Sequence, residues 1–249
     1  ILHGWRLIIF RTPYPDWLVL EIGADRPGDI RSLGHWLRPD IAVLTSLPAV
    51  PVHVEFFPSP EALFAEKGSL LAAVKPGGTV IVNEDDERVK AVTDKLIRKK
   101  KLEKRKIIRI GWNKSADIRV GNDHLSQDES GRPNGLVCKI DYEGHTVPLR
   151  LTRLYGPHQL YAILVGLAVG LAAGGPISTV ASALEGYAPP PGRGRLIEGI
   201  KGTWILDDSY NASPSAMAAA LETLKNFPSG GRKIAVLGDM LELGAYTID

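Results

Sequence analysis

The sequence predicts an α/β protein with a mostly parallel sheet flanked by helices, followed by the start of a Rossmann-like C-terminal unit. Strand-like and helix-like segments alternate over roughly the first 110 residues, which is typical of βαβ units. A Pro- and Gly-rich stretch, "APPPGRGR" (188–195), then interrupts the chain before the alternation resumes. We therefore expect two units, residues 1–188 and 189–249, the second of them truncated.

Apolar segments of four to six residues are predicted to form the parallel strands, with amphipathic helices between them. The strands are expected at Trp17–Ile22, Ile41–Thr45, Thr79–Asn83 and Ile107–Ile110, and the helices at about 28–37, 60–74 and 86–100.

Residues 111–152 interrupt this pattern with short β-like segments among Gly, Asn and Asp, so an antiparallel excursion is expected there. The remaining predictions are antiparallel strands at Asp117–Val120, Leu136–Ile140 and Thr146–Leu151, helices at about 157–174 and 177–186, a hairpin at Leu196–Leu206, a helix at about 214–226 and a strand at Lys233–Leu237.

Composition excludes several classes of protein. Hydrophobic residues make up 44% and charged residues 23% of the 249 positions, as in an ordinary globular protein. A single cysteine, Cys138, excludes a disulfide framework and a Cys-rich zinc site and fits a reducing, cytoplasmic compartment. The longest apolar stretch, Leu160–Ala173, is shorter than the roughly 18 residues that cross a bilayer, so a buried helix and no membrane span are expected.

The ends and the charge distribution lead to three further expectations. The first residue is Ile and no signal peptide precedes it, so we expect an internal piece of a longer protein. Residues 95–106, "KLIRKKKLEKRK", hold eight Lys or Arg and one Glu but no aromatic residue. We interpret them as a solvated helix end, not a nucleic-acid site, and we expect a monomer without a nucleic-acid partner.

The stretch "LDDSYNASP" (206–214) predicts a binding site. An apolar strand ends there in Asp207 and Asp208, and Asn211 follows before a helix begins. Ser213 as N-cap and Pro214 at the first helical position explain only the last two residues. Junctions between strands and helices are common ligand sites in α/β sheets, so we expect the three polar residues before them to bind a ligand.

A lysine on an apolar helix face predicts a second part of the site. Lys67 lies on the stripe formed by Leu63, Leu70, Leu71 and Val74. It is either a side chain that extends to solvent or a partly buried amine of lowered basicity, able to react or to lie near a metal.

Two further residues are expected near Lys67. Glu21 ends the first predicted strand and His53 follows the second. Both would then lie at the carboxyl edge of the sheet, where they could bind a divalent cation together; singly, each would be an ordinary polar group at a strand end or in a loop.

The chain resembles the Mur ligase family in eight segments that follow the family's order and spacing. They most resemble the branch that joins D-alanyl-D-alanine to UDP-N-acetylmuramoyl-tripeptide. The segments are "EIGADRPGDI" (21–30), "PDIAVLTS" (39–46), "HVEFF" (53–57), "AEKGSLL" (65–71), "VNEDD" (82–86), "PPPGRGR" (189–195), "LDDSYNASP" (206–214) and "VLGDMLELG" (236–244).

The resemblance implies roles for the predicted site residues. Glu21 and His53 match magnesium ligands, and Lys67 matches a lysine that takes up carbon dioxide and forms a carbamate. Arg193 matches an arginine that approaches the ATP phosphates, so Lys67, His53 and Arg193 are the implied catalytic residues. The implied nucleotide contacts are Asp208, Asn211 and the amide of Gln159. The implied reaction is amide ligation through an acyl phosphate, with ATP and magnesium.

The chain also departs from the family pattern. It contains no Gly-Lys pair, so the Gly-rich phosphate loop is missing and we expect the 249-residue chain alone to be inactive. Gln159 and Ala162 stand where the family usually has Asn, and Ser213 and Ser215 where it has Asn and Asp. Two alternatives are another amide ligase of the superfamily, such as a folylpolyglutamate-type enzyme, or a degenerate, non-catalytic binding module.

Overall fold

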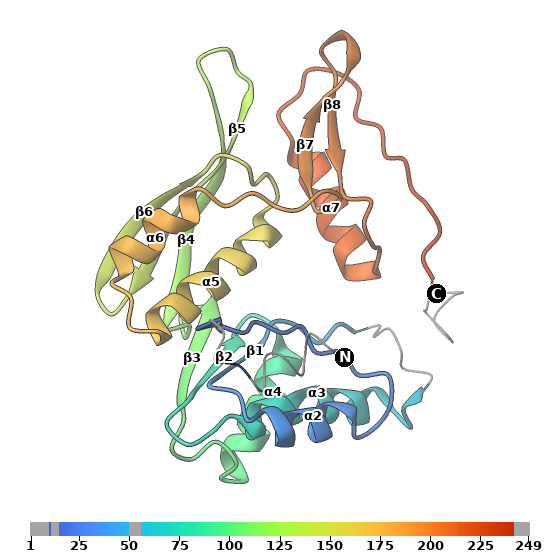
Figure 1. Ribbon diagram of the computed structural model, residues 1–249. Coiled ribbons are helices and arrows are strands. Elements are labelled where there is room, and N and C mark those ends of the chain that lie inside the picture. Colours follow the sequence, from blue (N-terminus) through green and yellow to red (C-terminus); the bar gives the residue numbers. More distant parts are fainter. Residues whose placement is uncertain (1–9, 11–14, 50–55, 242–249) are drawn as a thin grey trace.

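The computed structural model describes residues 10, 15–49 and 56–241 of the chain (Figure 1). Its larger part is a six-stranded sheet in the order β1-β2-β3-β4-β5-β6, and a separate two-stranded sheet, β7-β8, follows. The first three strand pairs are parallel and the next two are antiparallel. The predicted mostly parallel α/β architecture is therefore confirmed.

The parallel strands β1 (Ile41–Leu44), β2 (Thr79–Asn83) and β3 (Lys106–Gly111) lie close to their predicted positions. Strand β2 lies between the other two, and all five of its residues are buried. A strand buried on both faces has a continuous apolar sequence instead of an alternating one. This explains why the apolar run "TVIV" could be predicted as a strand from the sequence.

Helices cover both faces of this sheet (Figure 1). On one face, α3 (Pro60–Ala73) and α4 (Glu87–Arg98) pack against Val80 and Val82, and α2 (Asp29–Leu37) packs against α3. On the other, α5 (Leu160–Ala172) packs against Ile81, with α6 (Ile177–Glu185) beside it. Alternate residues of β2 therefore serve different layers of the protein, as the two-residue period of a strand requires.

The predicted antiparallel excursion is confirmed, with longer strands than expected. Strands β4 (Ile118–Gln127), β5 (Pro133–Tyr142) and β6 (His145–Leu151) extend the sheet on one side. The pairing of β4 with β5 changes register between Gly121 and His124. Irregular pairing of this kind weakens the alternation of polar and apolar residues, which is why the sequence predicted only fragments of these strands.

The C-terminal elements form a hairpin and a helix. Strands β7 (Arg195–Glu198) and β8 (Trp204–Asp207) are antiparallel, and α7 (Pro214–Asn226) follows them. The Ser213 hydroxyl accepts a hydrogen bond from the Ala216 N–H at 3.3 Å, so the predicted N-cap of α7 is confirmed. The division of the chain at 188/189 stays a prediction.

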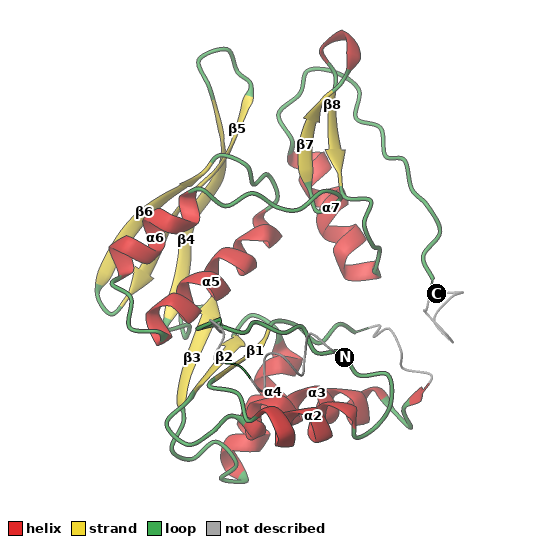
Figure 2. Ribbon diagram, in the orientation of Figure 1, coloured by secondary structure: helices red, strands yellow, loops and turns green. Residues whose placement is uncertain are grey.

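Two predicted strands are wrong. Residues Trp17–Ile22 and Lys233–Leu237 are loops in the structure, and Figure 2 draws both segments without arrows. Val19 and Val236 are 86% and 93% exposed. Their apolar sequences favour extended backbone, but among the described residues neither segment pairs with a strand. A strand is stabilised by its cross-strand partners, so sequence preference was not sufficient.

The basic segment is largely a solvated helix end. Most Lys and Arg side chains of 95–106 are exposed, as expected for the end of α4 and the turns after it. Arg105 differs, because its guanidinium donates to the carbonyl oxygens of Val74 and Ala72 at the end of α3. Among the helices of the described ranges, none is long and apolar enough to span a membrane.

The single cysteine should be unreactive in the folded chain. Cys138 is fully buried in β5, and burial raises the pKa of its thiol to about 11. Since only the thiolate reacts, we expect a chromogenic disulfide reagent at pH 8 to modify no thiol in the native chain and one thiol per chain in urea. The raised pKa also means that this residue's contribution to stability is present below the ordinary thiol pKa and is lost as the pH rises toward 11. Fast modification in buffer without denaturant would contradict the buried position.

Candidate functional site

A cavity of about 2230 Å³ lies between the carboxyl end of β1 and the turn that follows β8. One wall is formed by residues 16–25, by Thr45 and Ser46 after β1, and by Lys67 of α3. The opposite wall is formed by Arg193, residues 204–213, α7 and the segment 234–239. Typical small-molecule pockets occupy about 300–1,000 Å³, so this cavity has room for more than one substrate.

The turn after β8 is shaped by its own polar side chains. The Asp207 carboxylate accepts hydrogen bonds from the Ser209 hydroxyl at 2.6 Å and from the Gly192 N–H at 3.1 Å. The bond from Ser209 is the main reason that the pKa of Asp207 is lowered, so this carboxylate is ionised at neutral pH. Asp207 therefore holds the turn together and ties it to the linker between α6 and β7, residues 186–194.

Asp208 and Asn211 differ from Asp207 in their contacts. Both line the cavity. The Asn211 side-chain oxygen accepts from the N–H of Ala212 at 2.8 Å. No hydrogen bond or ion pair to the Asp208 carboxylate occurs within the part of the chain that the structure describes. Unlike the Asp207 carboxylate, it accepts no hydrogen bond there and is available to a ligand. Its negative charge does act on His158, whose pKa is lowered by burial and raised in part by Asp208.

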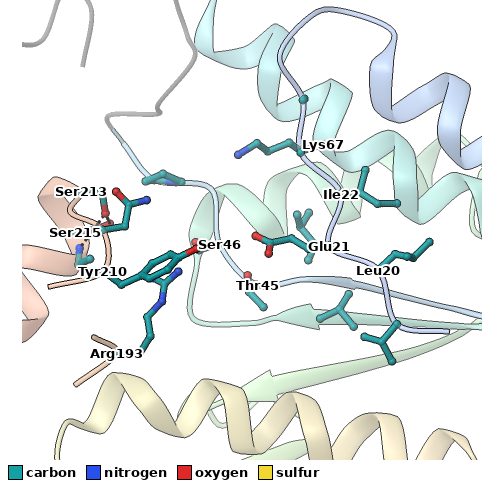
Figure 3. A pocket seen from close by; sticks show the side chains of 18 of the residues that line it. Leu20, Glu21, Ile22, Thr45, Ser46, Lys67, Arg193, Tyr210, Ser213 and Ser215 are labelled. Carbon is teal, nitrogen blue, oxygen red and sulfur yellow. Dashed lines mark hydrogen bonds between the residues drawn. The ribbon is translucent and has the colours of Figure 1, made fainter. Parts of the chain in front are cut away.

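Arg193 reaches the cavity from the linker and lies over an aromatic ring. Its guanidinium carbon is 4.2 Å from the centre of the Tyr210 ring, a cation–π contact that fixes the direction of the side chain. Figure 3 shows this pair facing Thr45, Ser46 and Glu21 across the cavity. Tyr210 is 70% exposed, so its ring is accessible to a ligand as well as to Arg193.

Lys67 lies on the opposite wall and is partly buried. Its helix neighbours Leu63 and Leu71 are fully buried, as the apolar stripe predicted. Burial lowers the pKa of the Lys67 amine, which increases the neutral fraction at a given pH. The side chain lines the cavity and, in Figure 3, extends into it from the same side as Glu21.

Glu21 is in the cavity, although the reason given for it from the sequence is wrong. The residue does not end a strand, because Trp17–Ile22 is a loop. It is nevertheless brought next to the end of β1, since that loop lines the same wall as Thr45 and Ser46. His53 lies outside the described residues. In the described ranges there is no cluster of three or more His, Cys, Asp or Glu side chains able to hold a metal ion.

Gln159 does not line this cavity. Its amide forms four hydrogen bonds to backbone groups, two of them in the Arg193–Gly194 segment. The structure thus brings together Glu21 and Lys67 on one wall of the cavity. Arg193, Asp208 and Asn211 lie on the other wall, and Gln159 is hydrogen-bonded to the backbone of Arg193 outside the cavity. The predicted roles of these residues stay predictions.

Sequence reasoning missed Tyr210 and the hydroxyl groups of Thr45 and Ser46. Tyr210 stands inside the polar turn "DDSYNASP", where an exposed aromatic ring is unusual and could have been noticed. The hydroxyls follow directly on the buried strand β1, so their position at the carboxyl edge of the sheet could also have been recognised.

A second cavity, of about 530 Å³, lies between β4, the turn at 155–158 and α7. His158 lines it, and burial lowers the pKa of this imidazole, which favours the neutral ring. Of the predicted site residues that the structure describes, none lines this second cavity.

Comparison with known proteins matches two family models to the chain. The "Mur ligase middle domain" model matches residues 8–170 and the "Mur ligase, glutamate ligase domain" model matches residues 192–249. The UDP-N-acetylmuramoyl-tripeptide–D-alanyl-D-alanine ligase of Mycobacterium leprae is 32% identical, with 99% of this chain and 49% of that protein aligned. The Escherichia coli ligase of the same name is 29% identical over 94% of this chain and 48% of its own length.

Solved structures show the same fold. MurF from Thermotoga maritima, in complex with ADP, superposes with a TM-score of 0.72 at 28% identity, covering 88% of this chain and 46% of that one. MurF from Acinetobacter baumannii gives a TM-score of 0.74 at 22% identity over 90% and 45% of the two chains. The chain spans about half the length of the curated relatives it matches. Because the middle-domain model alone covers more than half of the 249 residues, this chain belongs to the Mur ligase family.

Proposed function

We propose that the chain is part of an ATP-dependent ligase that joins D-alanyl-D-alanine to UDP-N-acetylmuramoyl-tripeptide. Its relatives from Mycobacterium leprae and Escherichia coli carry that name and align with nearly the whole chain. The observation that carries the proposal is the large cavity, in which Arg193, Asp208 and Asn211 face Glu21 and Lys67.

The wall around Arg193 is suited to a nucleotide. A guanidinium group binds phosphate oxygens through several N–H donors at once, and the Tyr210 ring holds that group at the cavity surface. Asp208 and Asn211 offer acceptors and an amide at the end of β8, where ribose hydroxyls or the adenine edge would bind. The Thermotoga maritima MurF structure contains ADP, which supports a nucleotide site in this fold.

The opposite wall is suited to magnesium bound together with phosphates. Magnesium usually keeps several waters and takes one or two protein carboxylates in addition to phosphate oxygens. Glu21 supplies one carboxylate, and the hydroxyls of Thr45 and Ser46 lie on the same wall. The neutral amine of Lys67 would react with carbon dioxide and lose a proton, and the resulting carbamate anion would add two more oxygens. When bound, the ion would offset negative charge on the phosphoryl oxygens.

The proposed reaction has two steps. The substrate carboxylate attacks the γ-phosphorus of ATP, the bond to the bridging oxygen breaks, and ADP leaves with that electron pair. The amine of D-alanyl-D-alanine then attacks the acyl phosphate, releases inorganic phosphate and loses a proton. Arg193 would stabilise charge on the transferred phosphoryl group, and the size of the cavity would keep both substrates in one place.

The test is an assay of the protein that the complete reading frame encodes. We expect one ADP and one phosphate per ligated product, formed only when UDP-N-acetylmuramoyl-tripeptide, D-alanyl-D-alanine and magnesium are all present. The 249-residue chain alone, which lacks a Gly-Lys phosphate loop, should release no ADP above background.

Parallel reactions with a folate and glutamate test the folylpolyglutamate-type alternative. ADP release with those substrates, and none with the muramoyl peptide, would overturn the proposal. ATP binding without turnover of either substrate pair would favour the non-catalytic binding module.

A further inference from the structure

Gln159 ties the turn before α5 to the linker that carries Arg193. It stands at the end of the 3-10 turn η2 (Pro157–Gln159). Its side-chain oxygen accepts from the N–H groups of Tyr155 and Gly156 at 2.8 and 3.0 Å. Its amide nitrogen donates to the carbonyl oxygens of Arg193 and Gly194 at 3.0 and 3.4 Å. A primary amide has two acceptor sites and two N–H bonds, so this side chain is fully used.

The linker is held from its other side as well. Asp207 accepts the Gly192 N–H at 3.1 Å, and the Gly192 carbonyl accepts the Tyr210 N–H at 3.1 Å. Tyr210 also lies under the guanidinium of Arg193. Arg193 is thus the one residue of the linker whose backbone is held by Gln159 and whose side chain is held by Tyr210, within the described part of the chain.

Gly194 shows how closely Gln159 approaches the linker. Its φ of +70° is a conformation that suits glycine, and a Cβ atom at this position would lie 2.6 Å from the Gln159 amide nitrogen. Gly202 has nearly the same φ, +71°, but a Cβ there would meet nothing within 4 Å. Comparing an alanine substitution at Gly194 with one at Gly202 therefore distinguishes the cost of the backbone conformation from the effect of the contact with Gln159.

We propose that Gln159 is a positioning residue for Arg193: its amide fixes the backbone from which the guanidinium enters the cavity. The proposal rests on the proposed function, since Arg193 is taken there to contact the phosphates of ATP. A shift of about 1 Å in a group that contacts the reacting atoms can lower a rate by up to a hundredfold. Because all four hydrogen-bonding positions of Gln159 are occupied, we assign it this role instead of a direct contact with the nucleotide.

If Gln159 only shaped the turn before α5, a variant that keeps its acceptor and loses its donor would leave the linker unchanged. The bonds to Tyr155 and Gly156 only shape the turn before α5, and they need an acceptor but no donor. Gln159→Glu keeps the size and the acceptor, and it replaces the donor with an oxygen that faces the carbonyls of Arg193 and Gly194. This substitution therefore removes the tether to the linker and leaves the turn in place.

The first measurement does not depend on catalysis. Hydrogen–deuterium exchange of the amides at 192–195 should become about tenfold faster in Gln159→Glu and in Gly194→Ala. Gln127→Glu, on the exposed end of β4, and Gly202→Ala are the matched controls and should leave this exchange unchanged. Protection of the Cys138 thiol shows whether each variant is folded.

The second measurement uses the ligase encoded by the complete reading frame. Gln159→Glu should lower kcat by about ten- to a hundredfold with a smaller change in KM for ATP. In the Arg193→Ala background, adding Gln159→Glu should cause no further loss, because the two residues act through one group.

These outcomes distinguish the positioning role of Gln159 from the proposed ligase function. Unchanged exchange at 192–195 in folded Gln159→Glu, or full additivity with Arg193→Ala, would overturn the positioning role. Faster exchange in a protein that shows no ligation would support the tether while the proposed function failed.

Discussion

Replacing Lys67 with alanine is expected to lower ATP-dependent ligation by several orders of magnitude. The amine lies on the cavity wall that also holds Glu21, and burial lowers its pKa. A lowered pKa favours the neutral amine, the form that reacts with carbon dioxide, and the resulting carbamate is an anion with two oxygens that magnesium would bind. Without the side chain, the site loses that anion. A small carboxylic acid added to Lys67→Ala should restore part of the rate by occupying the space.

Lys67→Arg and Lys95→Arg form the matched pair. The guanidinium at 67 stays cationic and cannot form a carbamate, so this variant should be as inactive as the alanine variant. Lys95 is exposed on α4, away from the cavity, and its substitution should be silent. Near-normal turnover of Lys67→Arg would show that Lys67 is only a partly buried surface lysine.

The carbamate also gives a readout that does not require turnover. With ¹³C-labelled bicarbonate, the wild-type protein should show one protected carbamate resonance that is absent in Lys67→Arg. Because the pKa of Lys67 is lowered by burial, the amine loses its proton at a lower pH than an exposed lysine. The resonance should therefore appear at lower pH than carbamates of exposed lysines and grow as the pH rises.

Replacing Arg193 with alanine is expected to lower kcat by about a hundredfold or more, the scale for a single group that stabilises charge in a transition state. Arg193→Lys should recover little of this. A lysine keeps the charge but loses the planar group that lies over Tyr210 and can bind two phosphate oxygens.

Tyr210→Phe and Arg153→Ala are the controls for Arg193. The phenylalanine keeps the aromatic face and should retain most activity. Tyr210→Ala removes the ring under the guanidinium and should lower kcat, but less than Arg193→Ala does. Arg153 is exposed and does not line the cavity, so Arg153→Ala should have no effect. Equal rates for Arg193→Ala and the wild type would remove Arg193 from the proposed mechanism.

The elements that could be predicted from the sequence are those whose ends are determined by neighbouring residues and those that are completely buried. Helix α7 begins where expected because Ser213 and Pro214 determine its start. Strand β2 was recognisable because every one of its residues is buried. Trp17–Ile22 and Lys233–Leu237 have the composition of strands, but a strand also requires a partner, and pairing is not encoded in the segment itself.

The candidate site was predictable to a similar degree. Periodicity placed Lys67 on an apolar face, and the polar turn after β8 identified Asp208 and Asn211. The positions of Glu21 and Gln159 depend on tertiary structure. Glu21 reaches the cavity on a loop instead of a strand, and Gln159 contacts a linker 34 residues away in sequence. Neither contact follows from local spacing.

The central claim is that ATP binds in the large cavity, against Arg193 and the turn after β8. Photolabelling of the protein encoded by the complete reading frame with 8-azido-ATP and magnesium tests it most directly. We expect the label on the tryptic peptide 202–225, at residues within 207–213, and we expect unmodified ATP to prevent the labelling. Label that competes with ATP but falls on residues 123–127, in the second cavity, would contradict the claim.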